Sequence, residues 1–406
     1  GMVGFSSFGL QAVLLNLYLV HLGFDTASIG RFLAAAQICF GFAALPAGVI
    51  GARCGPRNGL LTGTALVSAG WALFTLAESA PSGWMAVTLQ MGLILANMGQ
   101  ATMIVNGAPY LMCITDETNR FYYLSIQQAF QALLGLTGGF IGGALPGVMA
   151  GLSNHGRGDA EYYRYVLGLI PVVFAAAFIC LLRARVVHLQ PAAQDGSNAA
   201  YGPSRFPKIV FAVYPIIVFL AIVGDFGSRN FFNLYLVKLG LETRQIGLMF
   251  GLNQLAPLIT ALAIPGILNR IGTGRTFSAG AIMLSGALLF LSISTGLAGA
   301  AVGFFLMALM ATVLQATRSL FGQELVEARW RTFIAAAGTI SMSLGSASSS
   351  ILAGSVIPSL GFHALFRISA ALVFLSGLTA LMYLKIHNRC RARDQAIGRT
   401  SSMLQR

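Results

Sequence analysis

Hydrophobic residues form long stretches that recur along the whole chain, separated by short polar segments. Most stretches reach about 20 residues, the length that a helix needs to cross a bilayer. The pattern predicts an all-α membrane protein with twelve membrane-spanning helices. Their approximate ranges are 1–21, 27–51, 58–79, 83–108, 121–150, 162–183, 209–237, 244–268, 276–296, 298–323, 332–357 and 362–386.

A polar segment, Arg183–Lys208, separates the first six predicted spans from the last six and is the one sizeable linker. We therefore predict two six-helix bundles joined by a cytoplasmic linker and followed by a cytoplasmic tail. The predicted ranges are 1–184 for the first bundle, 185–208 for the linker, 209–387 for the second bundle and 388–406 for the tail.

The two halves repeat each other. The octapeptide Asn16–Gly23 recurs, with His21 replaced by lysine, 217 residues later at Asn233–Gly240. The match continues without a gap, since Gly30 falls on a glycine at the same shift. Self-similarity at a fixed shift indicates two copies of one structural unit. Because the seventh span begins near residue 209, the first span is expected to be about one or two turns shorter at its cytoplasmic end.

Composition excludes a water-soluble fold. Hydrophobic residues make up 56% of the chain and charged residues 9%, against about 25% charged in a soluble domain. The net charge of +13 does not indicate a nucleic-acid partner, because 17 of the 25 Lys and Arg lie in loops after even-numbered spans and in the tail. This bias predicts that those loops and the C-terminus are cytoplasmic. We predict a multi-pass protein of the bacterial inner membrane.

Other function classes lack their signatures. The five cysteines show no metal-ligand or disulfide spacing. None of the three lysines follows a glycine, so a phosphate-binding loop is absent. We expect no metal, no cofactor and no ATP-driven step, and the scarcity of acid, base and metal-binding residues within the spans argues against an enzyme.

Polar side chains inside the spans follow a period of three helices. Spans 1, 4, 7 and 10 are polar, whereas spans 3, 6, 9 and 12 are almost entirely apolar in their middles. Polar groups in hydrocarbon are costly, so this pattern predicts a lumen lined by spans 1, 4, 7 and 10. The substrate-binding candidates are Gln11, Asn16, Asn97, Gln100, Gln131, Arg229, Asn230, Asn233, Asn253, Gln254, Gln315 and Arg318.

The charged residues of spans 7 and 10 are the sharpest chemical signal. Asp225 is the one carboxylate deep in a span, and Arg229 follows one helical turn later on the same face. The two form either a structural ion pair or a proton-coupling site in which Asp225 titrates. Arg318 either pairs with Asp225 across the lumen or binds an anionic substrate.

Small residues are concentrated in spans 5 and 11, for example Gly139, Gly143, Ser350 and Gly354. Small faces permit close helix contact in a membrane. The two spans occupy equivalent places in the repeat. They form a static packing seam, a gliding interface between the halves, or both.

The loop after span 2 resembles the signature G-x-x-x-D-R-x-G-R-[RK] of the major facilitator superfamily. Gly48, Arg53, Gly55 and Arg57 fit, and Ala52 replaces the Asp. The second copy keeps Arg270 and Gly272, with Asn269 in the Asp place. In that family the Asp helps to hold the cytoplasmic gate shut. Here the resemblance implies a gating loop whose arginines, Arg275 among them, use helix C-termini instead.

The resemblance extends over essentially the whole chain and implies two bundles that rock about a central site. Span 5 is also similar to the antiporter motif G-x-x-x-G-P-x-x-G-G of the family, with Leu134 and Gly139 at two of its places. This similarity favours export, although a glycine-rich packing face explains the same residues. Span 4 lacks the arginine carried by many drug–proton antiporters.

Together these features predict a monomeric secondary transporter that works by alternating access. Its partners are the lipid bilayer, a small organic solute and a proton, and it is more consistent with export. The first alternative is an importer or uniporter of an anionic metabolite, which the two arginines within the spans favour. The alternative outside transport is a membrane sensor or scaffold, for which the chain lacks a soluble domain of any size.

Overall fold

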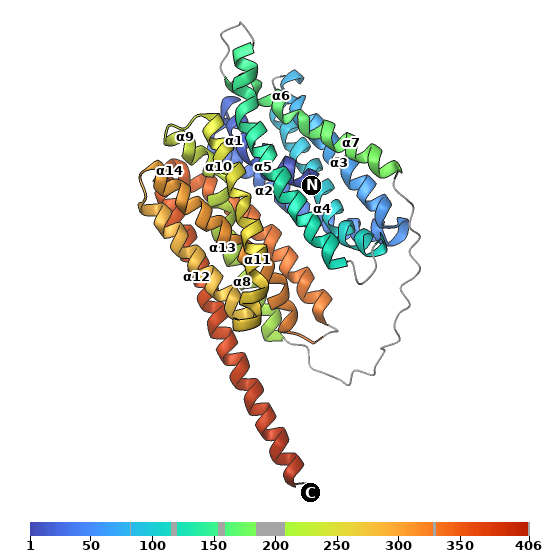
Figure 1. The fold of residues 1–406 in the computed structure, drawn as a ribbon, viewed down its shortest axis with the longest axis vertical. Helices are drawn as coiled ribbons and strands as arrows, with labels where there is room; N and C mark the ends of the chain where they lie inside the picture. Colours follow the sequence, from blue (N-terminus) through green and yellow to red (C-terminus); the bar gives the residue numbers. More distant parts are fainter. Residues whose placement is uncertain (82, 115–119, 153–158, 184–207, 328–329, 405–406) are drawn as a thin grey trace.

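Helices account for nearly all of the structure, a computed structural model that describes residues 1–81, 83–114, 120–152, 159–183, 208–327 and 330–404. Figure 1 shows two groups of helices side by side, one from each half of the sequence. No strand occurs in these residues. The predicted all-α class is confirmed.

The helices of the first half are η1 (Gly4–Leu10), α1 (Gln11–His21), α2 (Thr26–Cys54), α3 (Pro56–Thr75), η2 (Ala77–Ser79), α4 (Met85–Ile114), α5 (Arg120–Leu152), η3 (Asp159–Tyr162), α6 (Tyr163–Leu167) and α7 (Leu169–Arg183). Those of the second half are α8 (Lys208–Asn230), α9 (Phe232–Lys238), α10 (Thr243–Asn253), α11 (Leu255–Ile271), α12 (Thr273–Ile293), α13 (Leu297–Glu324) and α14 (Arg331–Leu404). η1 is a π-helical stretch that runs directly into α1.

Eight helical stretches in the described residues are long and apolar enough to cross a membrane. One of them covers the last two predicted spans, because α14 continues through a non-helical backbone conformation at Gly361. The chain is therefore a multi-pass integral membrane protein. The count of twelve crossings stays a prediction.

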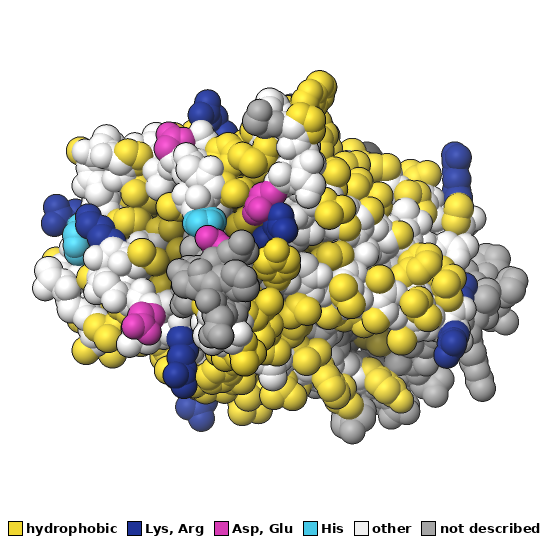
Figure 2. Space-filling model, turned by 90° about the horizontal axis from the view of Figure 1, so that it is seen from above, with side chains coloured by type: hydrophobic (Ala, Val, Ile, Leu, Met, Phe, Trp, Pro, Cys, Tyr) yellow, Lys and Arg dark blue, Asp and Glu magenta, His cyan; other side chains and the backbone are white. Residues whose placement is uncertain are grey.

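Large apolar side chains point outward along these helices. Leu45, Leu262 and Ile293 are 72%, 82% and 73% exposed. In Figure 2 hydrophobic side chains cover large connected areas of the visible face, and charged side chains appear as separate spots. An apolar exterior of this extent is unfavourable in water and suits a lipid environment.

The sequence repeat is also a repeat of backbone conformation. Gly23 and Gly240 have φ of 87° and 83°, and Gly55 and Gly272 have φ of 88° and 83°. Each pair is 217 residues apart. Positive φ is easily adopted only by glycine, so these residues end helices at matching places in the two halves. We call the end near Gly55 and Gly272 the arginine-rich end and the end near Gly23 and Gly240 the arginine-poor end.

The small faces of spans 5 and 11 lie at the contacts between the halves. A Cβ on Gly247 of α10 would stand 2.4 Å from the Cα of Gly143 on α5, and one on Gly30 of α2 would stand 2.5 Å from the carbonyl oxygen of Ser350 on α14. Gly30 and Gly247 are repeat partners. Two equivalent seams, α5–α10 and α2–α14, therefore join the halves through backbone-to-backbone packing.

Most of the predicted linker, residues 184–207, lies outside the described residues. In the predicted tail the backbone remains helical up to Leu404, where α14 ends, and extends away from the bundles (Figure 1).

Candidate functional site

Asp225 and Arg229 form an ion pair on α8. Nη2 of Arg229 donates to both carboxylate oxygens of Asp225, at 2.9 and 2.7 Å. The Asp225 side chain is 9% exposed and that of Arg229 32%. One helical turn separates the residues, so α8 alone positions the pair. The predicted contact is present, and it leaves the Nε of Arg229 buried without a partner.

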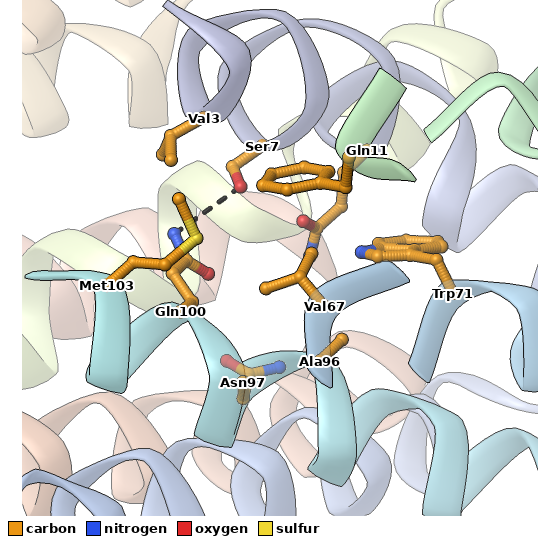
Figure 3. Close-up of a pocket in the computed structure, with 10 residues that line it drawn as sticks. Val3, Ser7, Gln11, Val67, Trp71, Ala96, Asn97, Gln100 and Met103 are labelled. Atoms are coloured by element: carbon orange, nitrogen blue, oxygen red, sulfur yellow. Dashed lines mark hydrogen bonds between the residues drawn. The ribbon is translucent and has the colours of Figure 1, made fainter. Parts of the chain in front are cut away.

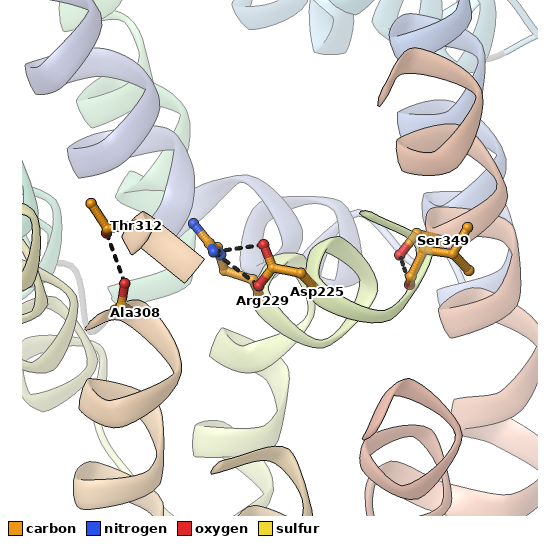
Figure 4. A network of polar contacts seen from close by, with 6 residues as sticks. Asp225, Arg229, Ala308, Thr312 and Ser349 are labelled. Carbon is orange, nitrogen blue, oxygen red and sulfur yellow. Dashed lines mark hydrogen bonds and ion pairs between the residues drawn. The ribbon is translucent and has the colours of Figure 1, made fainter. Parts of the chain in front are cut away.

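α13 and α14 flank this pair. In Figure 4 the Arg229 guanidinium lies on the side of Asp225 that faces Thr312 of α13, away from Ser349 of α14. The Ser349 hydroxyl donates to the carbonyl of Val223 at 2.7 Å, so α14 contributes neutral hydroxyls that are already bonded to backbone.

Arg318, also on α13, is the second arginine inside the spans. Its backbone carbonyl accepts a hydrogen bond of 3.1 Å from the Tyr214 hydroxyl of α8. Its guanidinium is half-buried and, within the described part of the chain, forms no ion pair. It lies close enough to Asp225 for an electrostatic interaction without contact. The predicted Asp225–Arg318 pairing is therefore absent from this conformation.

Asn16 and Asn233, equivalent by the repeat, meet between the halves. Nδ2 of Asn16 donates to Oδ1 of Asn233 at 3.1 Å and also to the carbonyl of Asn230. Nδ2 of Asn233 donates to the carbonyls of Ala12 and Val13 at 3.3 and 3.1 Å. Both side chains are almost fully buried. We refer to Asn16 and Asn233 as the asparagine clasp.

Further hydrogen bonds join the halves around the clasp. Tyr163 and Thr243 share one of 2.8 Å, and Nε2 of Gln254 donates to the carbonyl of Phe8 at 3.2 Å. These contacts lie between mid-height and the arginine-poor end. The conformation is thus one in which the halves are held together at that end.

The sequence did not indicate the Tyr163–Thr243 contact or a polar cluster around Tyr18. The Tyr18 hydroxyl donates to Glu78 at 2.7 Å, and Arg164 pairs with the same carboxylate at 2.8 Å. Tyr18 lies within the repeated octapeptide, so the repeat was the available signal for a structural role. Nothing in the sequence indicated its partners.

Gln11, Asn97 and Gln100 converge in the first half, where they line a pocket with Ser7 and Trp71 (Figure 3). Nε2 of Gln100 donates to the Ser7 hydroxyl at 3.4 Å, and Nδ2 of Asn97 donates to the carbonyl of Leu93. The pocket has about 10 Å³ of space, roughly enough for one water molecule. It is polar but too small for an organic solute in this conformation.

Three other candidates remain apart from these groups. Gln131 is half-buried on α5, and Gln315 is exposed on α13. Oδ1 of Asn253 is buried without a hydrogen-bond partner at the end of α10, where the helix breaks before α11. Nothing in the structure groups these residues with Asp225 and Arg229.

The predicted gating loops lie at the arginine-rich end. Gly48 and Arg53 are on α2, and Gly55 ends that helix; Gly272 ends α11 just after Arg270. Nη2 of Arg57 donates to the carbonyl of Leu182 at 2.8 Å, in the last turn of α7. This contact places a cation at a helix C-terminus within the first half. The gating role of these loops stays a prediction.

A family model described as the Major Facilitator Superfamily matches residues 1–349 of the chain. The chain belongs to this superfamily. No curated protein matches it in sequence.

Solved structures of transporters resemble it over almost the full length. A D-xylose–proton symporter has a TM-score of 0.73 at 14% identity, with 93% of each chain covered. A point mutant of the nucleoside transporter NupG has a TM-score of 0.74 at 13% identity, with 94% of this chain and 98% of that one covered. A proton-dependent oligopeptide transporter has a TM-score of 0.71 at 13% identity, with 96% and 97% covered. These likenesses establish the fold.

Because the chain belongs to this superfamily and shares the fold of these transporters, it is a secondary transporter rather than an enzyme. The fold places the substrate sites of such proteins between the two halves, near the middle of the membrane. In this chain Asp225 lies about 26 Å along α8 from its start at Lys208.

Proposed function

We propose that this superfamily member is a proton-coupled transporter of a small organic solute, with Asp225 as its proton site. The observation that carries the proposal is the ion pair of Asp225 and Arg229, buried in a helix of the second half and lacking a counterpart in the first half. A buried carboxylate inside a membrane helix is retained for pairing or for function. Protonation of Asp225 would release Arg229, so a single proton alters the donors available to a solute.

The remaining predicted residues take supporting roles in this proposal. The chain is divided into bundles 1–184 and 209–387, which rock about the α5–α10 and α2–α14 seams. The asparagine clasp closes the arginine-poor end, and Gly48, Arg53, Gly55, Arg57, Arg270 and Gly272 control the arginine-rich end. The latter end is cytoplasmic and the protein acts as a monomer.

Two directions of transport have separate support. Export is favoured by the glycine-rich face of α5, which resembles the antiporter motif and packs at a seam between the halves. Uptake or facilitated passage of an anionic metabolite is favoured by Arg318, whose guanidinium has no anionic partner in the described residues. An exporter and a proton-driven importer would share the proton site, whereas facilitated passage would not use it.

Transport by the full chain in vesicles tests the proposal. Wild type and Asp225→Asn are reconstituted, a pH gradient is imposed, and accumulation of a panel of neutral, anionic and cationic solutes is measured. We expect gradient-driven accumulation by wild type and loss of the gradient dependence in Asp225→Asn. Full gradient-driven accumulation by the variant would exclude Asp225 as the proton site.

A further inference from the structure

The charges deep in the second half do not balance. Asp225 and Arg229 neutralise each other, and Arg318 adds one positive charge that no described carboxylate contacts. An uncompensated charge within a membrane protein is unfavourable unless a partner reaches it. No such partner is present among the described residues, so an anionic ligand would fit there.

The hydrogen-bond donors show what kind of partner fits. Arg229 uses Nη2 alone for both oxygens of Asp225, and its Nε remains buried and unbonded. The Arg318 guanidinium is entirely free of ion pairs within the described part of the chain. Guanidinium groups match the planar carboxylate and the phosphate group with two parallel N–H···O bonds. The free donors on α8 and α13 therefore suit an acidic group.

We infer that the transported solute is an organic anion and that its carboxylate or phosphate group binds Arg318 and, once Asp225 is protonated, Arg229. This inference rests on the proton-coupled transport proposed above and names its substrate class. The Tyr214 hydroxyl donates to the Arg318 carbonyl, which links α8 to α13 at a point eleven residues before Asp225.

The same arrangement determines how proton and solute are coupled. Among the described residues, Arg229 of the same helix contacts Asp225, and Arg318 of α13 acts on it electrostatically without contact. From the neighbouring helices, α14 presents serine hydroxyls such as Ser349, and α1 presents Asn16 near the next turn. A proton that binds Asp225 frees Nη2 of Arg229 and raises the local charge by one. Binding of the anion then returns the local charge to its earlier value. Proton and anion thus bind together and cross in the same direction, which favours uptake over export.

Binding to the purified full-length protein gives the first test. Thermal unfolding is followed with benzoate, glycerol 3-phosphate, uridine or choline, each at pH 5.5 and pH 8. We expect stabilisation by at least one of the two anions, with an apparent affinity about tenfold higher at pH 5.5. Benzoate and glycerol 3-phosphate distinguish carboxylate from phosphate recognition. Stabilisation by uridine or choline alone, or by none of the four, would overturn the inference.

Variants of Arg318 test whether anion binding depends on its guanidinium. Arg318→Gln should weaken anion binding at least tenfold. Arg318→Lys should retain part of the binding, because lysine keeps the positive charge but lacks the two parallel N–H donors of the guanidinium. Arg244→Gln removes the same charge from an exposed position on α10 and serves as the matched control. Equal losses in Arg318→Gln and Arg244→Gln would show a general charge effect and contradict the site.

The two proposals fail in different ways. If a neutral solute is accumulated under a pH gradient and Asp225→Asn abolishes this accumulation, proton coupling stands and the anion inference is wrong. If anions bind in a manner that depends on Arg318 but Asp225→Asn leaves gradient-driven uptake intact, the substrate class stands and the proton site is wrong.

Discussion

The first helical segments of the two halves, η1–α1 and α8–α9, share a scaffold and differ in charge. Both carry the octapeptide. The two asparagines of the clasp stand at equivalent places in the halves, and so do the buried Tyr18 and Tyr235 and the positive-φ Gly23 and Gly240. Asp225 and Arg229, however, fall opposite Phe8 and Ala12 of the first half. The shared residues hold the halves together, whereas the residues found in one copy supply the chemistry.

The largest expected effect comes from removing the charges of α8, which the equivalent segment η1–α1 of the first half does not carry. Arg229→Ala leaves a buried, unpaired carboxylate and should destabilise the fold by about 3 kcal/mol. Adding Asp225→Leu removes that carboxylate, so the double variant should recover most of the loss while losing proton-driven transport. Thermal unfolding in detergent measures the first result and vesicle transport the second. A double variant no more stable than Arg229→Ala would show that the pair is not an electrostatic unit.

The seams should be nearly as sensitive. Gly247→Ala places a Cβ 2.4 Å from the Cα of Gly143, and overpacking of this kind costs about 1–3 kcal/mol. Gly286→Ala on α12 is the matched control, because a Cβ at this position would have no atom within 4 Å. This variant should be as stable as wild type or slightly more stable. Equal melting temperatures for the two variants would contradict close packing at the α5–α10 seam.

The clasp should respond to a double-mutant cycle. Asn16→Leu or Asn233→Leu leaves the other amide buried with fewer partners, at a cost of about 1–3 kcal/mol. Because the two side chains bond to each other, the double variant should lose less than the sum, by at least about 0.5 kcal/mol. Thermal unfolding of the four proteins measures the coupling. Strict additivity would mean that the amides act independently.

The smallest expected difference separates the repeated tyrosines. Tyr18 donates to the Glu78 carboxylate at 2.7 Å, whereas Tyr235 donates to the carbonyl of Ser294 at 3.2 Å. Hydrogen bonds to charged groups contribute about 1.5–3 kcal/mol and neutral ones about 0.5–1.5. Tyr18→Phe should therefore lower the melting temperature more than Tyr235→Phe. The reverse order would show that exposure of Glu78 to solvent cancels the advantage of its charge.

The sequence predicted the features that depend on periodicity or on neighbours along one helix. The repeat anticipated the equivalence of Asn16 and Asn233, and helical spacing anticipated the contact of Asp225 with Arg229. Contacts that depend on how separate helices approach were not accessible. The repeat does not reveal that equivalent asparagines lie next to each other, and nothing near Tyr163 along the chain indicates Thr243 as its partner.

Arg318 illustrates the same limit. Its position in a polar span was evident, and both pairing with Asp225 and ligand contact agreed with the sequence. Which of the two applies depends on how α8 and α13 approach each other, and the sequence does not indicate that approach. In the structure the Tyr214 hydroxyl of α8 donates to the Arg318 carbonyl of α13, and Arg318 and Asp225 form no ion pair.

The asparagine clasp has the symmetry of a homodimer interface. On a two-fold axis a residue meets its own copy, and two half-length chains associating about such an axis would bring the same asparagine together from both partners. A fused chain keeps that contact while each half becomes free to change alone. One copy can then acquire an aspartate and an arginine without disturbing the axis, and the clasp keeps a symmetric contact between two halves that are no longer equal.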